Sequence, residues 1–90
     1  MQTTRRDPSP TRRVSTLINR SFHLIDAADT EAALNRARTY AIGVLDCALA
    51  SGYIDDDTYA IRSSDVISRA DTCQRDLQAR AGRIAAEYLD

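Results

Sequence analysis

Apolar side chains recur at helical spacing in the first third of the chain. Between residues 10 and 27 they follow one another at intervals that place them on one face of a helix: Val14, Leu17, Ile18, Phe22 and Ile25. Ser9 and Pro10 favour a helix start, because serine caps helices and proline fits the first helical position. The pattern therefore predicts a first helix over about residues 10–27.

A second apolar stripe follows a predicted turn at residues 26–30 and consists of Leu34, Ala37, Ala41, Val44, Leu45 and Ala48. We expect a helix over about residues 30–51, capped by Asp29 or Thr30. Gly52 favours its end, because glycine adopts a positive φ without steric penalty. No glycine or proline separates this helix from the first, so one bent helix is the alternative.

The third predicted helix has the strongest start signal. Asp55 is a natural N-cap, Asp56 and Asp57 favour the positive end of the helix dipole, and Ile54 with Tyr59 fits a hydrophobic staple. From there to residue 89 a stripe spaced three and four residues apart predicts packing against an antiparallel neighbour: Ala60, Ser63, Ile67, Ala70, Gln74, Leu77, Ala81, Ile84 and Tyr88. Its polar face has three acid–arginine pairs four residues apart: Asp65–Arg69, Asp71–Arg75 and Asp76–Arg80.

No segment alternates with the period of a β-strand, so we expect an all-α fold. The second and third helices form a three-helix bundle with the first, or a long antiparallel hairpin that the first helix covers. Residues 1–9 are expected to be a flexible basic arm, and residues 10–90 a single helical domain with helices at about 10–27, 30–51 and 56–89. Because 14 of the apolar residues are alanine, the core is thin. Self-association as a homodimer would therefore stabilise it.

Charge is segregated along the chain, although the net charge is only −1. Residues 1–13 carry Arg5, Arg6, Arg12 and Arg13 against one acid, whereas residues 39–61 carry four acids and no base. Such asymmetry bears on partners rather than on fold. The four arginines can contact nucleic acid, but arms of this kind also serve only as solubilising tails.

The residue types needed for catalysis or metal binding are sparse. His23 is the only histidine, and the three consecutive aspartates lack the alternating spacing of a calcium loop. Cys47 and Cys73 match no redox or zinc motif. In the predicted hairpin they lie roughly 20 Å apart and stay free thiols. We expect no enzyme activity, catalytic residue, metal or cofactor. No apolar run is long enough to span a membrane and no secretory signal is present, which predicts a cytoplasmic location.

The most distinctive candidate surface is the predicted turn between the second and third helices, residues 53–59, which we call the acidic elbow. Tyr53 and Tyr59 flank the carboxylates of Asp55, Asp56 and Asp57. Tyrosine is enriched at protein interfaces, and the carboxylates suit a basic, nucleic-acid-binding surface on a protein partner. The alternative is a well-capped turn whose tyrosines face the core. A helix-turn-helix DNA reader is disfavoured, because its reading helix would begin with three acids.

The stretch 40–59 also resembles a helical hairpin of small phage and mobile-element proteins, including some anti-CRISPR proteins against type I systems. Its residues read Tyr-Ala-Ile-Gly-Val-Leu-Asp-Cys-Ala-Leu-Ala-Ser-Gly-Tyr-Ile-Asp-Asp-Asp-Thr-Tyr. The resemblance implies a non-enzymatic inhibitor that binds a type I CRISPR effector complex and blocks its DNA or nuclease access. The alternative function is a DNA- or RNA-associated accessory or regulatory protein that uses the arginine arm. Direct nucleic-acid binding ranks second to protein binding.

Overall fold

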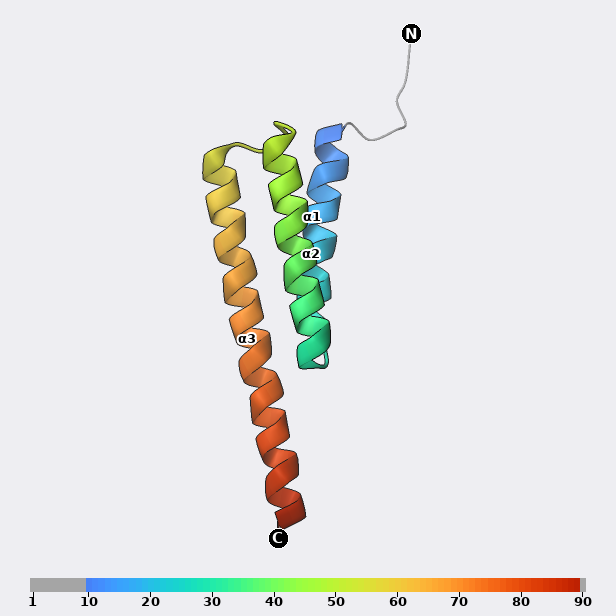
Figure 1. The fold of residues 1–90 in the computed structure, drawn as a ribbon, viewed down its shortest axis with the longest axis vertical. Coiled ribbons are helices and arrows are strands. Elements are labelled where there is room, and N and C mark those ends of the chain that lie inside the picture. The colour runs from blue at the N-terminus through green and yellow to red at the C-terminus, as the bar shows by residue number, and fades with distance from the viewer. Residues whose placement is uncertain (1–9, 90) are drawn as a thin grey trace.

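The computed structural model describes residues 10–89, and within them the chain forms three α-helices and no strand. α1 spans Pro10–Asp26, α2 spans Glu31–Ala50 and α3 spans Asp56–Leu89. These bounds differ by at most one residue from the expected ranges, and the predicted arm, residues 1–9, lies outside the described residues. α1 and α3 run in one direction, and α2 runs antiparallel to both (Figure 1). Each helix contacts the other two, so the fold is an all-α three-helix bundle.

α1 and α2 are separate helices joined by a tight turn, which excludes a single bent helix. α1 closes with the N–H of Ala27 donating to the carbonyl of His23 at 2.9 Å. Thr30 then adopts extended backbone with φ −139°, and its hydroxyl oxygen accepts the N–H of Ala33 at 3.0 Å. Thr30 is therefore the N-cap of α2, and this cap starts the helix without any glycine or proline at the turn.

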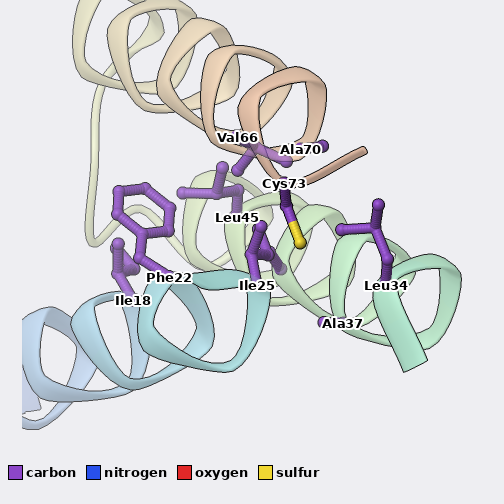
Figure 2. Packing of buried hydrophobic residues seen from close by; sticks show 10 residues of the cluster. Ile18, Phe22, Ile25, Leu34, Ala37, Leu45, Val66, Ala70 and Cys73 are labelled. Atoms are coloured by element: carbon purple, nitrogen blue, oxygen red, sulfur yellow. The ribbon is translucent and has the colours of Figure 1, made fainter. Parts of the chain in front are cut away.

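The core is built from a few large side chains set against small ones on α2. Figure 2 shows this cluster, which consists of Ile18, Phe22 and Ile25 from α1, Leu34, Ala37, Ala41 and Leu45 from α2, and Val66, Ala70 and Cys73 from α3. Ile25, Leu45 and Val66 are completely buried. The alanines of α2 let the neighbouring helices approach closely, so a thin set of apolar residues still forms one contiguous core.

The apolar face of α3 differs from the expected stripe in its first half. Val66, Ala70 and Cys73 face the core, whereas Ile67 is 59% exposed. The prediction that Ile67 belongs to the seam was wrong, and the helix is rotated by about one residue position towards α1. In the second half Leu77 is partly buried against the core as expected, but Ala81, Ile84 and Tyr88 are exposed, so the prediction that they pack against the neighbouring helix was wrong.

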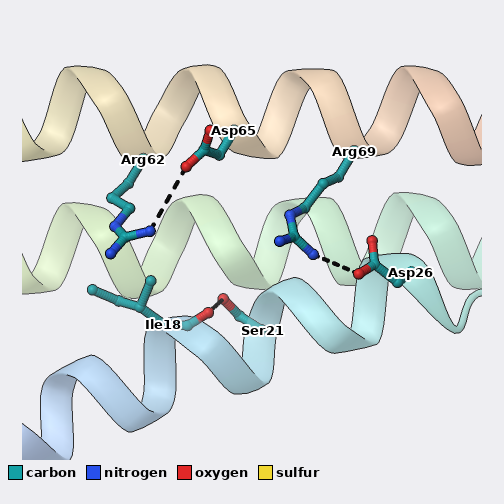
Figure 3. A network of polar contacts seen from close by, with 6 residues as sticks. All are labelled: Ile18, Ser21, Asp26, Arg62, Asp65 and Arg69. Carbon is teal, nitrogen blue, oxygen red and sulfur yellow. Dashed lines mark hydrogen bonds and ion pairs between the residues drawn. The ribbon is translucent and has the colours of Figure 1, made fainter.

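Two arginines of α3, Arg62 and Arg69, lie partly against α1 and partly in solvent, with 40% and 41% of their side-chain surface exposed. The guanidinium carbons of Arg69 and Arg62 lie 5.0 Å and 5.9 Å from the ring centroid of Phe22, which is the geometry of a cation–π contact. Arg69 also forms an ion pair with Asp26 at the end of α1, and Arg62 lies 3.7 Å from Asp65 (Figure 3). Arg69 thus pairs with Asp26 on α1, and Asp65 pairs with Arg62, in place of the expected Asp65–Arg69 pair.

The last part of α3 extends beyond the rest of the bundle. Figure 1 shows the helix continuing past the turn between α1 and α2, and every side chain from residue 78 to residue 88 is exposed. We call residues 78–89 the α3 overhang. At about 1.5 Å per residue it is roughly 18 Å long, and its first turn contributes Arg80 to a cleft that is also lined by Asp26 and Ala28.

Candidate functional site

The turn that carries the acidic elbow is closed by backbone hydrogen bonds. Gly52 has φ +79° and donates its N–H to the carbonyl of Leu49 at 3.1 Å, and Tyr53 donates its N–H to the carbonyl of Ala48 at 2.9 Å. These two bonds form a Schellman motif, which satisfies carbonyls at the end of α2. The elbow therefore holds a fixed shape at one end of the bundle.

The three aspartates of the elbow have different surroundings. The Oδ1 atom of Asp55 accepts the N–H of Thr58 at 2.8 Å, so Asp55 is the N-cap of α3. The Thr58 backbone N–H, helped by the Thr58 hydroxyl, lowers the pKa of Asp55 below its ordinary value of 3.8, because these bonds favour the charged carboxylate. Asp56 and Asp57 occupy the first turn of α3 and are exposed. Their carboxylates point into solvent without a structural task beyond the helix dipole.

The two tyrosines also differ. Tyr53 is 43% exposed at the surface of the elbow. Tyr59 is half-buried against the core, and its hydroxyl donates to Oδ1 of Asp46 on α2 at 2.6 Å. This bond, with burial and the negative charge of Asp46, raises the pKa of Tyr59 above its ordinary value of 10.0. Tyr59 therefore joins α2 to α3, and Tyr53 is the tyrosine whose ring is available at the surface.

The arginines of the alternative nucleic-acid site fall into two groups. Arg5 and Arg6 lie outside the described residues. Arg12 and Arg13 are exposed in the first turn of α1. That turn lies at the same end of the bundle as the elbow, because Thr11 and Val14 of α1 share a cleft with Tyr53.

The described residues contain no group of three histidine, cysteine, aspartate or glutamate side chains that could hold a metal ion. His23 is exposed on α1. Cys73 is buried, with its thiol 3.4 Å from the carbonyl oxygen of Ala28, whereas Cys47 is exposed. The two thiols are not bonded to each other, as the hairpin geometry predicted. The expectations that the chain has no metal, cofactor or enzyme activity stay predictions.

The structure reveals a further surface that the sequence reasoning missed, between α1 and α2 on the side away from the core seam of α3. We call it the apolar groove, and its lining is almost free of charge: Val14, Leu17, Tyr40, Val44, Cys47 and Tyr53. A smaller cleft shares Tyr40 with the groove and reaches Leu24 near the turn between the two helices, and Asp29 and Arg36 also line it. The sequence held a signal for this groove. Leu17 and Leu24 lie seven residues apart on α1, so they share a helix face, and the core-facing stripe of α1 does not account for both of them.

Comparison with protein-family models, with curated proteins and with solved structures found no match. Within residues 10–89, no helix is long and apolar enough to cross a bilayer. Function is therefore argued from the surfaces of the bundle themselves.

Proposed function

We propose that this chain is a non-enzymatic binding protein whose acidic elbow docks on a basic, nucleic-acid-binding surface of a protein partner. The observation that supports the proposal is the division of roles among the aspartates. Asp55 caps α3, whereas Asp56 and Asp57 are exposed and contribute little to folding. Tyr53 lies beside them, 43% exposed, and supplies a large, rigid ring of the kind enriched at interfaces.

The stretch of sequence that contains the elbow carries charge of one sign only, although Arg62 lines a cleft together with Asp55. Residues 39–61 contain Asp46 and the three elbow aspartates and no arginine, lysine or histidine. A surface patch of one sign steers a partner of the opposite sign and gives specificity more than raw affinity. The elbow is therefore suited to a groove that normally holds a phosphate backbone.

The most specific form of the proposal is an inhibitor of a type I CRISPR effector complex, acting in the cytoplasm of the host cell. It rests on the resemblance of residues 40–59 to helical hairpins of small phage proteins, together with the charge of the elbow. By occupying a basic surface of the effector, the elbow would block access of DNA or of the nuclease. No chemical step is required of the chain itself.

The alternative proposal is an accessory or regulatory protein that contacts DNA or RNA through Arg5, Arg6, Arg12 and Arg13. Each arginine that neutralises a phosphate releases counterions, so binding through the arm weakens steeply with salt. Salt-dependent binding of the isolated chain to duplex DNA would favour this alternative, provided that it weakens when residues 1–8, with Arg5 and Arg6, are deleted and weakens further when Arg12 and Arg13 are also replaced by Ala.

We also expect the chain to self-associate, because its core contains few large apolar side chains. A homodimer is compatible with the elbow as a docking site, because the elbow lies at one end of the bundle and the α3 overhang at the other (Figure 1).

The deciding experiment is a titration of the chain against a purified type I effector complex, with DNA binding by the effector as the second readout. Asp56→Arg combined with Asp57→Arg places positive charge against the partner's basic surface. We expect at least a tenfold loss of affinity, about 1.4 kcal/mol, and a corresponding loss of inhibition. Binding of the wild-type chain should also weaken as salt rises from low to physiological ionic strength.

The matched control is Asp71→Arg combined with Asp76→Arg, which changes the net charge equally on exposed positions of α3 far from the elbow. The control should bind as tightly as the wild-type chain. Equal losses for both double variants would show that only net charge matters. Full binding by the elbow variant would show that the elbow is a helix cap and nothing more.

A further inference from the structure

The α3 overhang carries an apolar stripe that the rest of the described chain leaves exposed. Its members are Ala81, Ile84 and Tyr88, and Leu77 lies where the stripe meets the bundle. We propose that this stripe binds the same stripe of a second copy of the chain, so that the two overhangs lie side by side and antiparallel. The inference specifies the homodimer expected above. It leaves the acidic elbow free, because the elbow lies at the other end of the bundle (Figure 1).

The stripe continues a face of α3 that already packs against α1 and α2. Ile84 follows the completely buried Val66 by 18 residues, which is about five helical turns, so both side chains leave the helix in the same direction. Leu77 lies between them and is partly buried against the core. Beyond it, Ile84 is 49% exposed and Tyr88 is 87% exposed. The packing face of α3 is therefore longer than the pair of helices that covers it.

The spacing of the stripe fits an antiparallel helix pair. Its members follow one another at intervals of four, three and four residues, as in the seam of a coiled coil: Leu77, Ala81, Ile84 and Tyr88. A two-fold axis between residues 82 and 83 sets Leu77 of each copy level with Tyr88 of the other, and it sets Ala81 level with Ile84. Every layer thus joins a larger side chain to a smaller one, and the interface is isologous and closed.

The charged side chains beside the stripe select this direction and register. Arg80 and Glu87 are seven residues apart, so they lie on the same flank of the stripe. Like flanks face each other in an antiparallel pair, and the same two-fold axis sets Arg80 of each copy opposite Glu87 of the other. In a parallel pair that flank would instead face Gln78 and Ala85, which carry no charge. Within residues 10–89 no ion pair involves Arg80 or Glu87, so both are available to a second copy, and charges at such positions set the orientation of paired helices.

The length of the overhang matches the space available to the second copy. The α1–α2 turn reaches α3 at Cys73, whose thiol lies 3.4 Å from the carbonyl oxygen of Ala28. Leu77 is four residues, or about 6 Å, beyond that level. In the antiparallel pair the two helices run along each other for roughly 17 Å, and Tyr88 of the second copy arrives beside a cleft that Ala28, Cys73 and Leu77 line. Each overhang therefore ends where the α1–α2 turn of the other copy begins.

The contact is short, and its size sets the expected affinity. Two helical segments of about 12 residues bury less surface than the roughly 1,600 Å² of a standard complex, so we expect a dissociation constant on the order of tens of micromolar. The fraction of dimer therefore changes with protein concentration, and the measurement has to cover the range in which it does.

The first test is sedimentation equilibrium of the full chain from about 10 µM to about 1 mM. We expect a monomer–dimer equilibrium for the wild-type chain. Ile84→Asp places a charge in both layers that join Ala81 to Ile84, and it should raise the dissociation constant at least about tenfold. The matched control is Ile67→Asp, which adds the same charge at an exposed position of α3 outside the overhang and should leave the constant unchanged. Both variants should keep the helicity of the wild-type chain by circular dichroism, because both side chains are exposed in the single copy.

The second test addresses direction and register through the ion pairs. Arg80→Glu and Glu87→Arg each set like charges opposite each other, and each should raise the dissociation constant about threefold to tenfold in low salt. The double variant, Arg80→Glu with Glu87→Arg, restores opposite charges and should return the constant to near the wild-type value. A parallel pair, in which these side chains do not meet, predicts no such recovery.

The inference is overturned by a wild-type chain that stays monomeric up to about 1 mM, by equal effects of Ile84→Asp and Ile67→Asp, or by a double charge variant that dimerises no better than the single ones. A dimer that Leu17→Asp disrupts and Ile84→Asp leaves intact would place the interface in the apolar groove instead. Asp56→Arg with Asp57→Arg should weaken effector binding and leave the dimer unchanged, so failure of this inference is distinguishable from failure of the proposed function.

Discussion

Val66 and Ile67 are neighbours on α3 with opposite surroundings, and a pair of alanine substitutions measures that difference. Val66 is completely buried between α1 and α2, whereas Ile67 is 59% exposed. Val66→Ala removes two buried carbon groups at about 0.8 kcal/mol each and leaves a cavity in a core with little material to collapse into it. The expected loss in the free energy of unfolding is therefore about 1.5–3 kcal/mol.

Ile67→Ala should have almost no cost. The side chain packs against nothing buried, and alanine is the better helix former, so the free energy of unfolding should stay within about 0.5 kcal/mol of the wild-type value. In a chain of this size 1 kcal/mol corresponds to about 4–8 °C in the thermal midpoint. Val66→Ala should thus melt about 6–24 °C lower than the wild-type chain.

The assay is urea denaturation followed by circular dichroism at 222 nm, with thermal melts as the second readout. Both variants are compared with the wild-type chain at the same protein concentration, because any self-association would make the apparent stability depend on concentration. A large loss for Ile67→Ala together with a small loss for Val66→Ala would refute the packing described for α3. That result would instead support the sequence-based prediction that Ile67 belongs to the buried face of α3.

The remaining predictions concern the elbow and the thiols. Gly52→Ala should cost about 1 kcal/mol in a denaturation series, because φ +79° is strained for any residue with a Cβ. An unchanged midpoint would mean that the turn adopts another shape. Asp55→Ala should lower the thermal midpoint at pH 7 more than Asp57→Ala does. Because folding lowers the pKa of Asp55, its contribution is complete above the ordinary value of 3.8 and is lost as the pH falls through the folded-state value. The gap between wild type and Asp55→Ala should therefore close in acid, and a gap that stays constant would contradict the cap. A thiol reagent should label Cys47 rapidly in the native chain and Cys73 only at the rate of unfolding, because Cys47 is exposed and Cys73 is buried. Equal labelling rates would show that the packing around Cys73 is loose.

Local chemistry explains why the ends of the helices could be read from the chain. Thr30, Gly52 and Asp55 each act within a few residues of their own position, through a cap or a left-handed turn. Such effects need no knowledge of what packs where. The charge of the acidic elbow could likewise be predicted from neighbouring residues, but the contact made by Tyr59 could not. Its hydroxyl is bound by Asp46, which lies 13 residues away on the neighbouring helix.

The sequence by itself determined that this protein is helical, where its helical segments lie, and that its charge is divided between an arginine-rich beginning and an acidic elbow. It left open whether the first two segments form one bent helix, and the cap of Thr30 at the turn decided that they are separate. Only the tertiary structure decided which side of α3 faces inward. Val66, Ala70 and Cys73 face inward, and beside them the guanidinium carbons of Arg62 and Arg69 lie 5.9 Å and 5.0 Å from the centroid of the Phe22 ring. The apolar groove likewise exists only once α1 and α2 lie side by side. The physical reason is that capping and helix propensity act along the chain, whereas the orientation of a helix depends on contacts with residues far away in sequence.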